Sequence, residues 1–175
     1  MAKKSKPSKK EYNLEEDISE HNYVSEAAVT YGSFGSGKFV ILTGAAQKPE
    51  GQMSSFEKMA IVKNGITKKD LELLKSKAAL DYTMLAKALS VTRATLINKK
   101  REQKFGMVLS EKIVSLADVY SYGFEVFGDK DLFNQWMQSP NRAIGGESPY
   151  SLIDNQYGRE EIKNLIGRIA YGVYS

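Results

Sequence analysis

The residues best spaced for chemistry lie in a glycine-rich run, GSFGSGKF, at residues 32–39. Gly32, Gly37 and Lys38 have the spacing of a P-loop, in which backbone N–H groups and a lysine hold nucleotide phosphates. A P-loop continues into a hydroxyl residue that binds magnesium and then into a helix. Here Phe39 follows instead and opens a β-branched and aromatic run, FVILTG, which is typical of a strand. We therefore predict a glycine-rich turn, and a nucleotide site is the weaker alternative.

Other catalytic groups are scarce in this sequence. The chain has no cysteine, which removes disulfides, thiolate metal sites and cysteine nucleophiles together. Its single histidine, His21, lies in a polar segment and is poorly placed to act as the base of a catalytic triad. We predict that the protein is not an enzyme, with no catalytic residue, no metal site and no cofactor.

Charge is unevenly distributed along the 175 residues. Residues 63–112 carry twelve basic and five acidic side chains, whereas residues 113–175 carry five basic and eight acidic ones. A basic middle and an acidic end predict two functions, one of them directed at a polyanion. A cluster of solvated lysines with no partner is the alternative.

The order of segments predicts a mainly α fold with a short N-terminal extension. We predict a disordered leader at residues 1–20, and an extension at 21–62 with a loose β-hairpin and a linker at residues 45–52. From Thr67 onward the pattern is helical, and Thr67 with Asp70 has the spacing of a capping box. No apolar run approaches the ~20 residues of a membrane span, and the basic start lacks a signal peptide's apolar stretch, so we expect a cytoplasmic protein.

A helix-turn-helix is predicted at residues 81–104. Apolar residues line one face of a short helix, a break follows at Ser90, and Thr92 can cap a second helix from Arg93 to about Lys100. Arginine and asparagine can bond to base edges, while lysines suit phosphates. The predicted DNA-binding residues are Thr92, Arg93, Thr95, Asn98, Lys99, Lys100, Arg101 and Lys104. A helical hairpin with a solvated basic face is the alternative.

The last 40 residues carry a distinctive motif. A helix ends near Trp136, a polar connection with two prolines spans residues 140–149, and a final helix is predicted at Arg159–Tyr171 after a stop at Gly158. We predict that Trp136, Leu165 and Ile169 belong to the core. The polar loop residues Asn141, Arg142 and Glu147 are predicted to contact a partner, and the alternative is that they only join two helices.

These residues resemble a known family. Trp136, PN at 140–141, AIGG at 143–146, Pro149, LID at 152–154, Gly158 and LIGRIAYGVY at 165–174 look like the toxin-binding domain of Xre/MbcA/ParS-type antitoxins. The helix-turn-helix upstream is similar to the Xre-type DNA-binding half of the same proteins. The resemblance covers roughly residues 65–175.

The resemblance implies a type II antitoxin with two domains. Residues 63–128 would form the helix-turn-helix domain, which dimerises and binds operator DNA so that the operon represses itself. Residues 129–175 would form a small helical domain that caps the active site of a NAD-consuming toxin with a RES fold. The predicted toxin-binding residues are Asn141, Arg142, Gly145, Gly146, Glu147, Asp154 and Arg168. A plain helix-turn-helix regulator with a C-terminal oligomerisation domain is the alternative.

Overall fold

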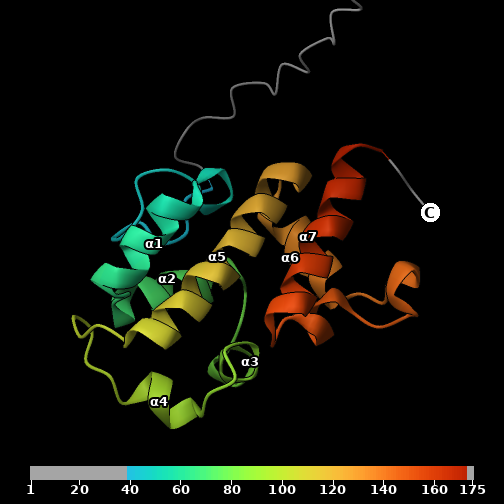
Figure 1. Ribbon diagram of the computed structural model, residues 1–175. Helices are drawn as coiled ribbons and strands as arrows, with labels where there is room; N and C mark the ends of the chain where they lie inside the picture. The colour runs from blue at the N-terminus through green and yellow to red at the C-terminus, as the bar shows by residue number, and fades with distance from the viewer. Residues whose placement is uncertain (1–38, 173–175) are drawn as a thin grey trace, which may run out of the picture. The chain divides into compact units, whose positions relative to one another are not determined.

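The computed structural model describes residues 39–172, which lie within one compact unit, Phe34–Ser175. This part of the chain contains only helices and no β-strand, which confirms the predicted mainly α fold (Figure 1). The α-helices are α1 (Ser55–Asn64), α2 (Lys68–Lys77), α3 (Tyr82–Ala88), α4 (Arg93–Ile97), α5 (Met107–Phe127), α6 (Lys130–Gln138) and α7 (Gln156–Ala170). Three short 3-10 helices accompany them: η1 (Glu50–Gln52), η2 (Arg142–Ile144) and η3 (Pro149–Leu152).

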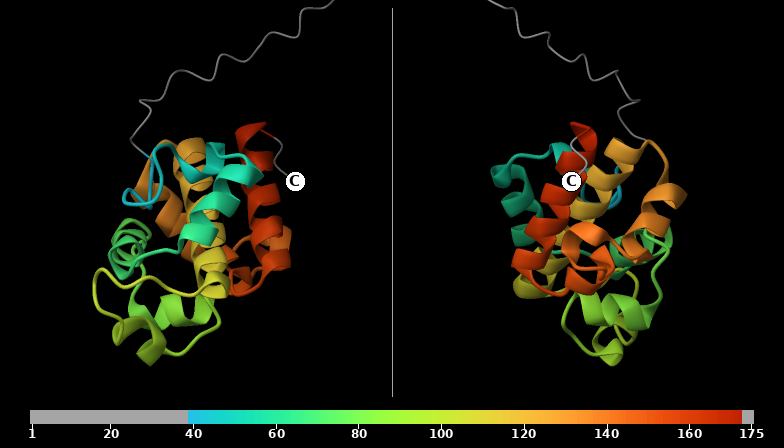
Figure 2. Two further views of the ribbon diagram at one scale, coloured as in Figure 1. Left: turned by 60° about the vertical axis from the view of Figure 1, so that its left-hand side comes forward. Right: turned by 90° about the vertical axis from the view of Figure 1, so that its right-hand side faces the viewer.

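The longest helix, α5, runs through the centre of the bundle. It contacts α1 and η1 on one side and α6 and α7 on the other, while α3 and α4 lie together near its start (Figures 1 and 2). Its buried positions include an aromatic cluster in which the ring of Phe133, from α6, packs edge-on against those of Tyr120 and Phe124. Gly123 is required here, because a Cβ at this position would lie 2.2 Å from the Phe133 ring. Trp136 stacks on the same ring but is only half-buried.

The predicted β-hairpin is wrong in its second arm. Residues Phe39–Leu42 are buried but irregular, and several of their backbone groups bond to side chains instead of to a strand. The N–H groups of Ile41 and Leu42 donate to the Glu50 carboxylate at 2.6–3.1 Å, and the Ser121 hydroxyl donates to the Phe39 carbonyl. The first arm and the glycine-rich run through Lys38 lie outside the described residues.

The predicted linker at residues 45–52 is also wrong. Ala46, Pro49 and Glu50 are buried, and the Glu50 carboxylate accepts from the N–H groups of Ile41 and Leu42. Burial raises the pKa of the Glu50 carboxyl, and the N–H groups of Leu42 and Ile41 act in the opposite direction. A buried carboxylate with hydrogen-bond partners therefore fixes this segment against α5, because an unpaired one would be strongly unfavourable.

Local capping signals predicted the starts of several helices. The Thr67 hydroxyl accepts from the N–H of Asp70 at 3.2 Å and donates to its carboxylate, as the spacing predicted. Thr92 caps α4 in the same way, accepting from the N–H of Thr95 at 3.2 Å. These bonds satisfy N–H groups that have no partner within a helix.

Helix α4 is shorter than predicted. It ends at Ile97 because the following residues turn back toward the start of α2 instead of continuing the helix. The N–H groups of Lys68 and Lys69 donate to the carbonyls of Gln103 and Arg101. The basic run after α4 is therefore a loop held against α2, and not the end of a recognition helix.

The prediction that Gly158 ends a helix is also wrong. Gly158 lies inside the first turn of α7, and a Cβ at this position would lie 1.7 Å from the carbonyl oxygen of Leu152. The glycine permits the backbone of η3 to cross the helix closely. Asn155 caps α7 by accepting from the N–H of Gly158 at 3.0 Å.

Candidate functional site

The exposed surface of α4 carries four of the predicted DNA-binding residues. Thr92 and Arg93 lie at its start, Thr95 follows one turn later, and Asn98 caps its end; all four side chains are exposed. Leu96 is fully buried and fixes the opposite side of the helix to the core. The turn from α3 contains Ser90 in a left-handed conformation, with φ of 53°, where this motif commonly has glycine.

The four basic residues after α4 differ in their exposure and in the contacts of their charged groups. Lys100 and Arg101 are exposed. Lys99 is half-buried, with its ammonium 5.5 Å from the centre of the Phe105 ring. The ammonium of Lys104 donates to the Asn64 side chain at 2.8 Å. Lys100 and Arg101 are therefore the residues best placed to attract phosphates from outside.

The loop at residues 141–147 is closed on itself. The N–H of Asn141 donates to the carbonyl of Glu147 at 2.9 Å, and the N–H of Gly146 donates back to the carbonyl of Asn141 at 2.9 Å. The Asn141 side chain accepts from the N–H of Ala143. Gly145 and Gly146 have φ values of 72° and 87°, which residues with a side chain rarely adopt. The loop is therefore preshaped, with the side chains of Arg142 and Glu147 exposed at its surface.

The other two predicted toxin-binding residues lie apart from this loop along the chain. Asp154 follows η3, and its carbonyl accepts from the Ser90 hydroxyl in the turn of the helix-turn-helix at 2.8 Å. Arg168 lies near the end of α7 and forms an ion pair with Glu161 at 3.0 Å. Among the described residues, no hydrogen bond connects the loop with Asp154 or with Arg168. In the described part of the chain, the loop, Asp154 and Arg168 are therefore not parts of one hydrogen-bonded network.

A buried arginine that the sequence analysis did not single out joins the two halves of the chain. The Arg159 guanidinium donates to the carbonyl of Ile153 at 2.9 Å and to that of Ala88, at the end of α3, at 2.7 Å. Burial lowers the pKa of this guanidinium, while the Asp154 charge acts in the opposite direction. The sequence pattern could have indicated that Arg159 is buried, since Arg159 occupies the same helical face as the buried residues Ile162 and Ile166.

Two further hydrogen bonds connect α3 and its C-cap with later parts of the chain. The Tyr150 hydroxyl donates to the carbonyl of Met84 in α3 at 2.9 Å. The Lys112 ammonium, near the start of α5, donates to the carbonyl of Leu89 at 3.1 Å. Helix α3 and its C-cap are thus held by side chains from η3, α7 and α5 together.

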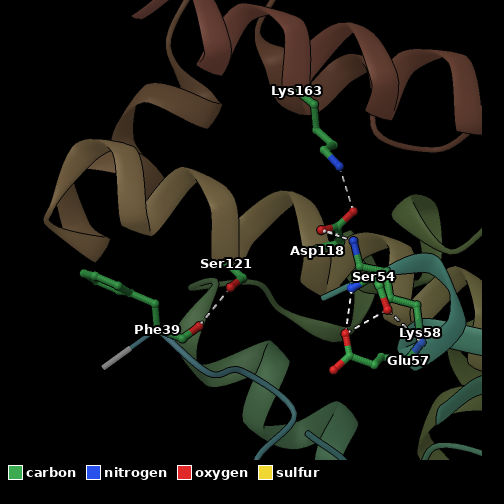
Figure 3. A network of polar contacts seen from close by, with 7 residues as sticks. All are labelled: Phe39, Ser54, Glu57, Lys58, Asp118, Ser121 and Lys163. Carbon is green, nitrogen blue, oxygen red and sulfur yellow. Dashed lines mark hydrogen bonds and ion pairs between the residues drawn. The ribbon is translucent and has the colours of Figure 1, made fainter. Parts of the chain in front are cut away.

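Asp118 forms a second polar junction in the centre of α5. Its nearly buried carboxylate binds the ammonium groups of Lys58, from α1, at 2.7 Å and of Lys163, from α7, at 2.9 Å (Figure 3). A buried carboxylate needs such partners, because one that lost them would be strongly unfavourable. This junction therefore fixes α1 and α7 on either side of α5.

An open groove of about 660 Å³ lies beside α7. It is lined by Gly51, Tyr122, Lys163, Asn164, Gly167 and Arg168. Within the described part of the chain, no group of three or more His, Asp or Glu side chains is arranged to hold a metal ion. None of the helices described is long and apolar enough to cross a membrane.

Comparison with known proteins assigns the C-terminal part of the chain. Residues 123–172 match the protein family described as the antitoxin Xre/MbcA/ParS C-terminal toxin-binding domain. This range begins inside α5 and includes α6, the loop at 141–147, η3 and α7.

Three curated relatives are similar over longer stretches. An Antitoxin Xre of Photorhabdus laumondii is 38% identical over 73 residues, which are 41% of this chain and 49% of the relative. An Antitoxin Xre of Yersinia enterocolitica is 29% identical over 56% of this chain and 68% of the relative. A protein of a Sphingobium strain, named Prs ADP-ribosylating antitoxin, is 25% identical over 70% of this chain and 83% of the relative. The match thus spans about half the length of the Photorhabdus relative.

Proposed function

We propose that this chain, which belongs to the Xre/MbcA/ParS antitoxin family, neutralises a cognate toxin through its C-terminal helices and binds operator DNA through α4. The observation that carries the proposal is the match of residues 123–172 to a toxin-binding domain. Such a domain acts by binding, in agreement with the prediction that the chain is not an enzyme. The toxin is proposed to have a RES fold and to consume NAD, and its active site to be capped by this domain.

The shape of the loop at 141–147 supports a role in capping the toxin. Its backbone bonds and two left-handed glycines fix its conformation before any partner arrives. A preshaped loop loses less conformational entropy on binding than a loose one. Arg142 and Glu147 are exposed on it and can pair with charges of the toxin.

The arrangement of α3 and α4 supports a role in DNA binding. A buried Leu96 and the Thr92 cap fix α4, so that Arg93, Thr95 and Asn98 face outward. A recognition helix contacts base edges in the major groove with its first turns, and residues before and after it contact phosphates. We propose that the chain acts as a homodimer or higher oligomer on its own operator and represses its own synthesis. The proposed domain boundary between residues 128 and 129 falls at Gly128, between α5 and α6.

The alternative is a helix-turn-helix regulator whose C-terminal helices only join copies of the chain. The two functions differ in whether the neighbouring open reading frame encodes a protein that binds this chain. The cytoplasmic location stays a prediction from the sequence.

The test is co-expression of the chain with the product of the adjacent open reading frame, with an affinity tag on one of them. The proposal expects the two proteins to purify together, and the complex to shift a fragment of the upstream DNA in a gel. Arg142→Ala and Glu147→Ala are expected to weaken the complex without changing the thermal melt or the DNA shift. A chain that shifts DNA but never retains its neighbour would favour the plain regulator.

A further inference from the structure

Helix α7 has one buried face and one outer face with a different composition. Its buried face packs on the core through Ile162, Ile166 and the Arg159 guanidinium. At 3.6 residues per turn, a second set of residues shares the opposite side of the helix. We call this set the α7 outer face: Tyr157, Glu161, Asn164, Arg168 and Tyr171.

Two exposed tyrosines mark the ends of the α7 outer face. Tyr157 is 81% exposed and Tyr171 is 77% exposed. They are fourteen positions apart, which corresponds to about 21 Å along a helix. Tyrosine combines a large apolar ring with a polar tip and loses little entropy when it is ordered, and for this reason it is enriched among the residues that dominate protein interfaces.

The polar side chains between the tyrosines already hold one another in place. Glu161 accepts from Arg168 at 3.0 Å and from Asn164 at 3.3 Å. These bonds order three side chains before a partner binds, so less conformational entropy is lost in the complex. The centre of the α7 outer face is thus a preformed polar surface between two aromatic ends.

The groove beside α7 continues this surface toward η1 and α5. Asn164 and Arg168 belong to both, and Gly167 keeps the groove open, since a Cβ there would lie 3.6 Å from the Tyr122 hydroxyl. Lys163 and Arg168 are the charged residues of its lining, and no acidic residue is among them. A groove with this lining favours an acidic side chain from the partner, although Lys163 also binds Asp118.

We propose that the cognate toxin docks on the α7 outer face, with Tyr157 and Tyr171 in two apolar pockets about 21 Å apart and an acidic toxin side chain in the groove between Gly51 and Gly167. The proposal rests on the proposed function, because α7 lies within the residues that match the toxin-binding domain. Operator DNA is a poor occupant for the same surface, since a polyanion would meet the Glu160 and Glu161 carboxylates.

The test uses the full chain and the product of the adjacent open reading frame. That protein is recovered from the co-expressed complex by denaturation and refolding, and its affinity for each variant is measured by biolayer interferometry. Tyr157→Ala and Tyr171→Ala are each expected to raise Kd about tenfold or more. Phe56→Ala is the matched control, because Phe56 is equally exposed, at 81%, but lies on α1.

Substitutions at Gly167 test whether the toxin uses the groove, because they add a side chain and remove none. Gly167→Leu places a side chain into the groove and is expected to weaken binding by at least the same factor. Alanine at Gly167 meets only ordinary contacts, and the helix gains from replacing glycine, so Gly167→Ala is expected to keep the fold. Ala60→Leu, on the exposed surface of α1, is the control for an added leucine.

Each outcome separates this inference from the function on which it rests. Failure of the wild-type chain to bind the neighbouring protein overturns the proposed function and this inference together. Tight wild-type binding that Tyr157→Ala, Tyr171→Ala and Gly167→Leu all leave unchanged overturns the inference alone. Variants that bind the toxin normally but lose self-association in light scattering assign the α7 outer face to a second copy of the chain, which also overturns it.

Discussion

Helices α4 and α7 both present an outer face, and the two faces have different chemistry. The five-residue α4 exposes hydroxyl, guanidinium and amide groups and is followed by a basic loop. The fifteen-residue α7 exposes tyrosines at its ends and paired charges between them. The first set suits phosphates and base edges, and the second suits another protein. The difference supports the proposal that one chain has two classes of partner.

The two regions are nevertheless joined by specific bonds. Side chains of Tyr150 and Arg159 donate to carbonyls of α3, and the Ser90 hydroxyl donates to the carbonyl of Asp154. A fragment that began near residue 110 would lose these partners, leaving the Arg159 guanidinium with one acceptor. Full-length variants therefore test the different roles of α4 and α7 better than fragments do.

The largest effect, on the free energy of unfolding, is expected from a substitution in the core beneath α6 and α7. Phe133→Ala removes a fully buried ring that contacts the rings of Tyr120, Phe124 and Trp136. It is expected to lower the free energy of unfolding by about 3–5 kcal/mol. Leu132→Ala, at an exposed neighbour, should change it by less than about 0.5 kcal/mol. Urea denaturation measures both, and equal effects would contradict the assigned core.

The next effect concerns the bonds between the two regions. Arg159→Ala leaves the carbonyls of Ala88 and Ile153 without their donor and is expected to lower the free energy of unfolding by about 2–3 kcal/mol. Arg168→Ala is the control, because its ion pair is about 40% exposed and should contribute less than about 1 kcal/mol. Equal denaturation midpoints for the two variants would show that Arg159 does not join the regions.

A smaller and more local effect, on DNA binding, is expected in α4, the proposed recognition helix. Arg93→Ala should weaken operator binding by about 1–3 kcal/mol at one base position and relax specificity there. The measurement is a set of fluorescence-anisotropy titrations with operators changed one base pair at a time. Equal weakening on operator and random DNA would place Arg93 on a phosphate and shift the assigned contacts along α4.

The smallest effect is expected for the exposed cations of the loop after α4. Lys100→Ala should weaken binding to all DNA sequences alike and reduce the slope of log K against log salt by about one unit. Lys104→Ala should reduce it less, because the Lys104 ammonium is bonded to Asn64. The same slope for both variants as for the wild type would mean that the loop does not contact DNA.

Local signals in the sequence predicted local structure well. The caps at Thr67 and Thr92, the turn at Ser90 and the end of α6 near Trp136 all depend on residues within a few positions of each other. Leu165 is buried as predicted, whereas Trp136 is half-buried against the core and Ile169 is only half-buried. Of the candidate sites, the exposed positions on α4 and on the 141–147 loop followed from the pattern, but their roles are still predictions.

The failures share a cause, which is a contact partner that lies outside the short run of residues on which each prediction rested. The apolar run at Phe39–Leu42 resembles a strand, yet its N–H groups meet the Glu50 carboxylate instead of a second strand. Gly158 resembles a helix stop, yet it permits the close crossing of Leu152. The groove beside α7 combines residues of η1, α5 and α7, and no short motif encodes such a surface.

We propose above that the C-terminal helices of this chain neutralise a toxin. The most direct measurement is growth of cells in which the product of the adjacent open reading frame is induced, with this chain supplied from a second promoter. We expect the wild-type chain and Phe56→Ala to restore growth, whereas the double variant Tyr157→Ala/Tyr171→Ala, shown to be folded by its thermal melt, does not. Continued growth arrest in the presence of abundant wild-type chain would contradict the proposed neutralisation of the toxin.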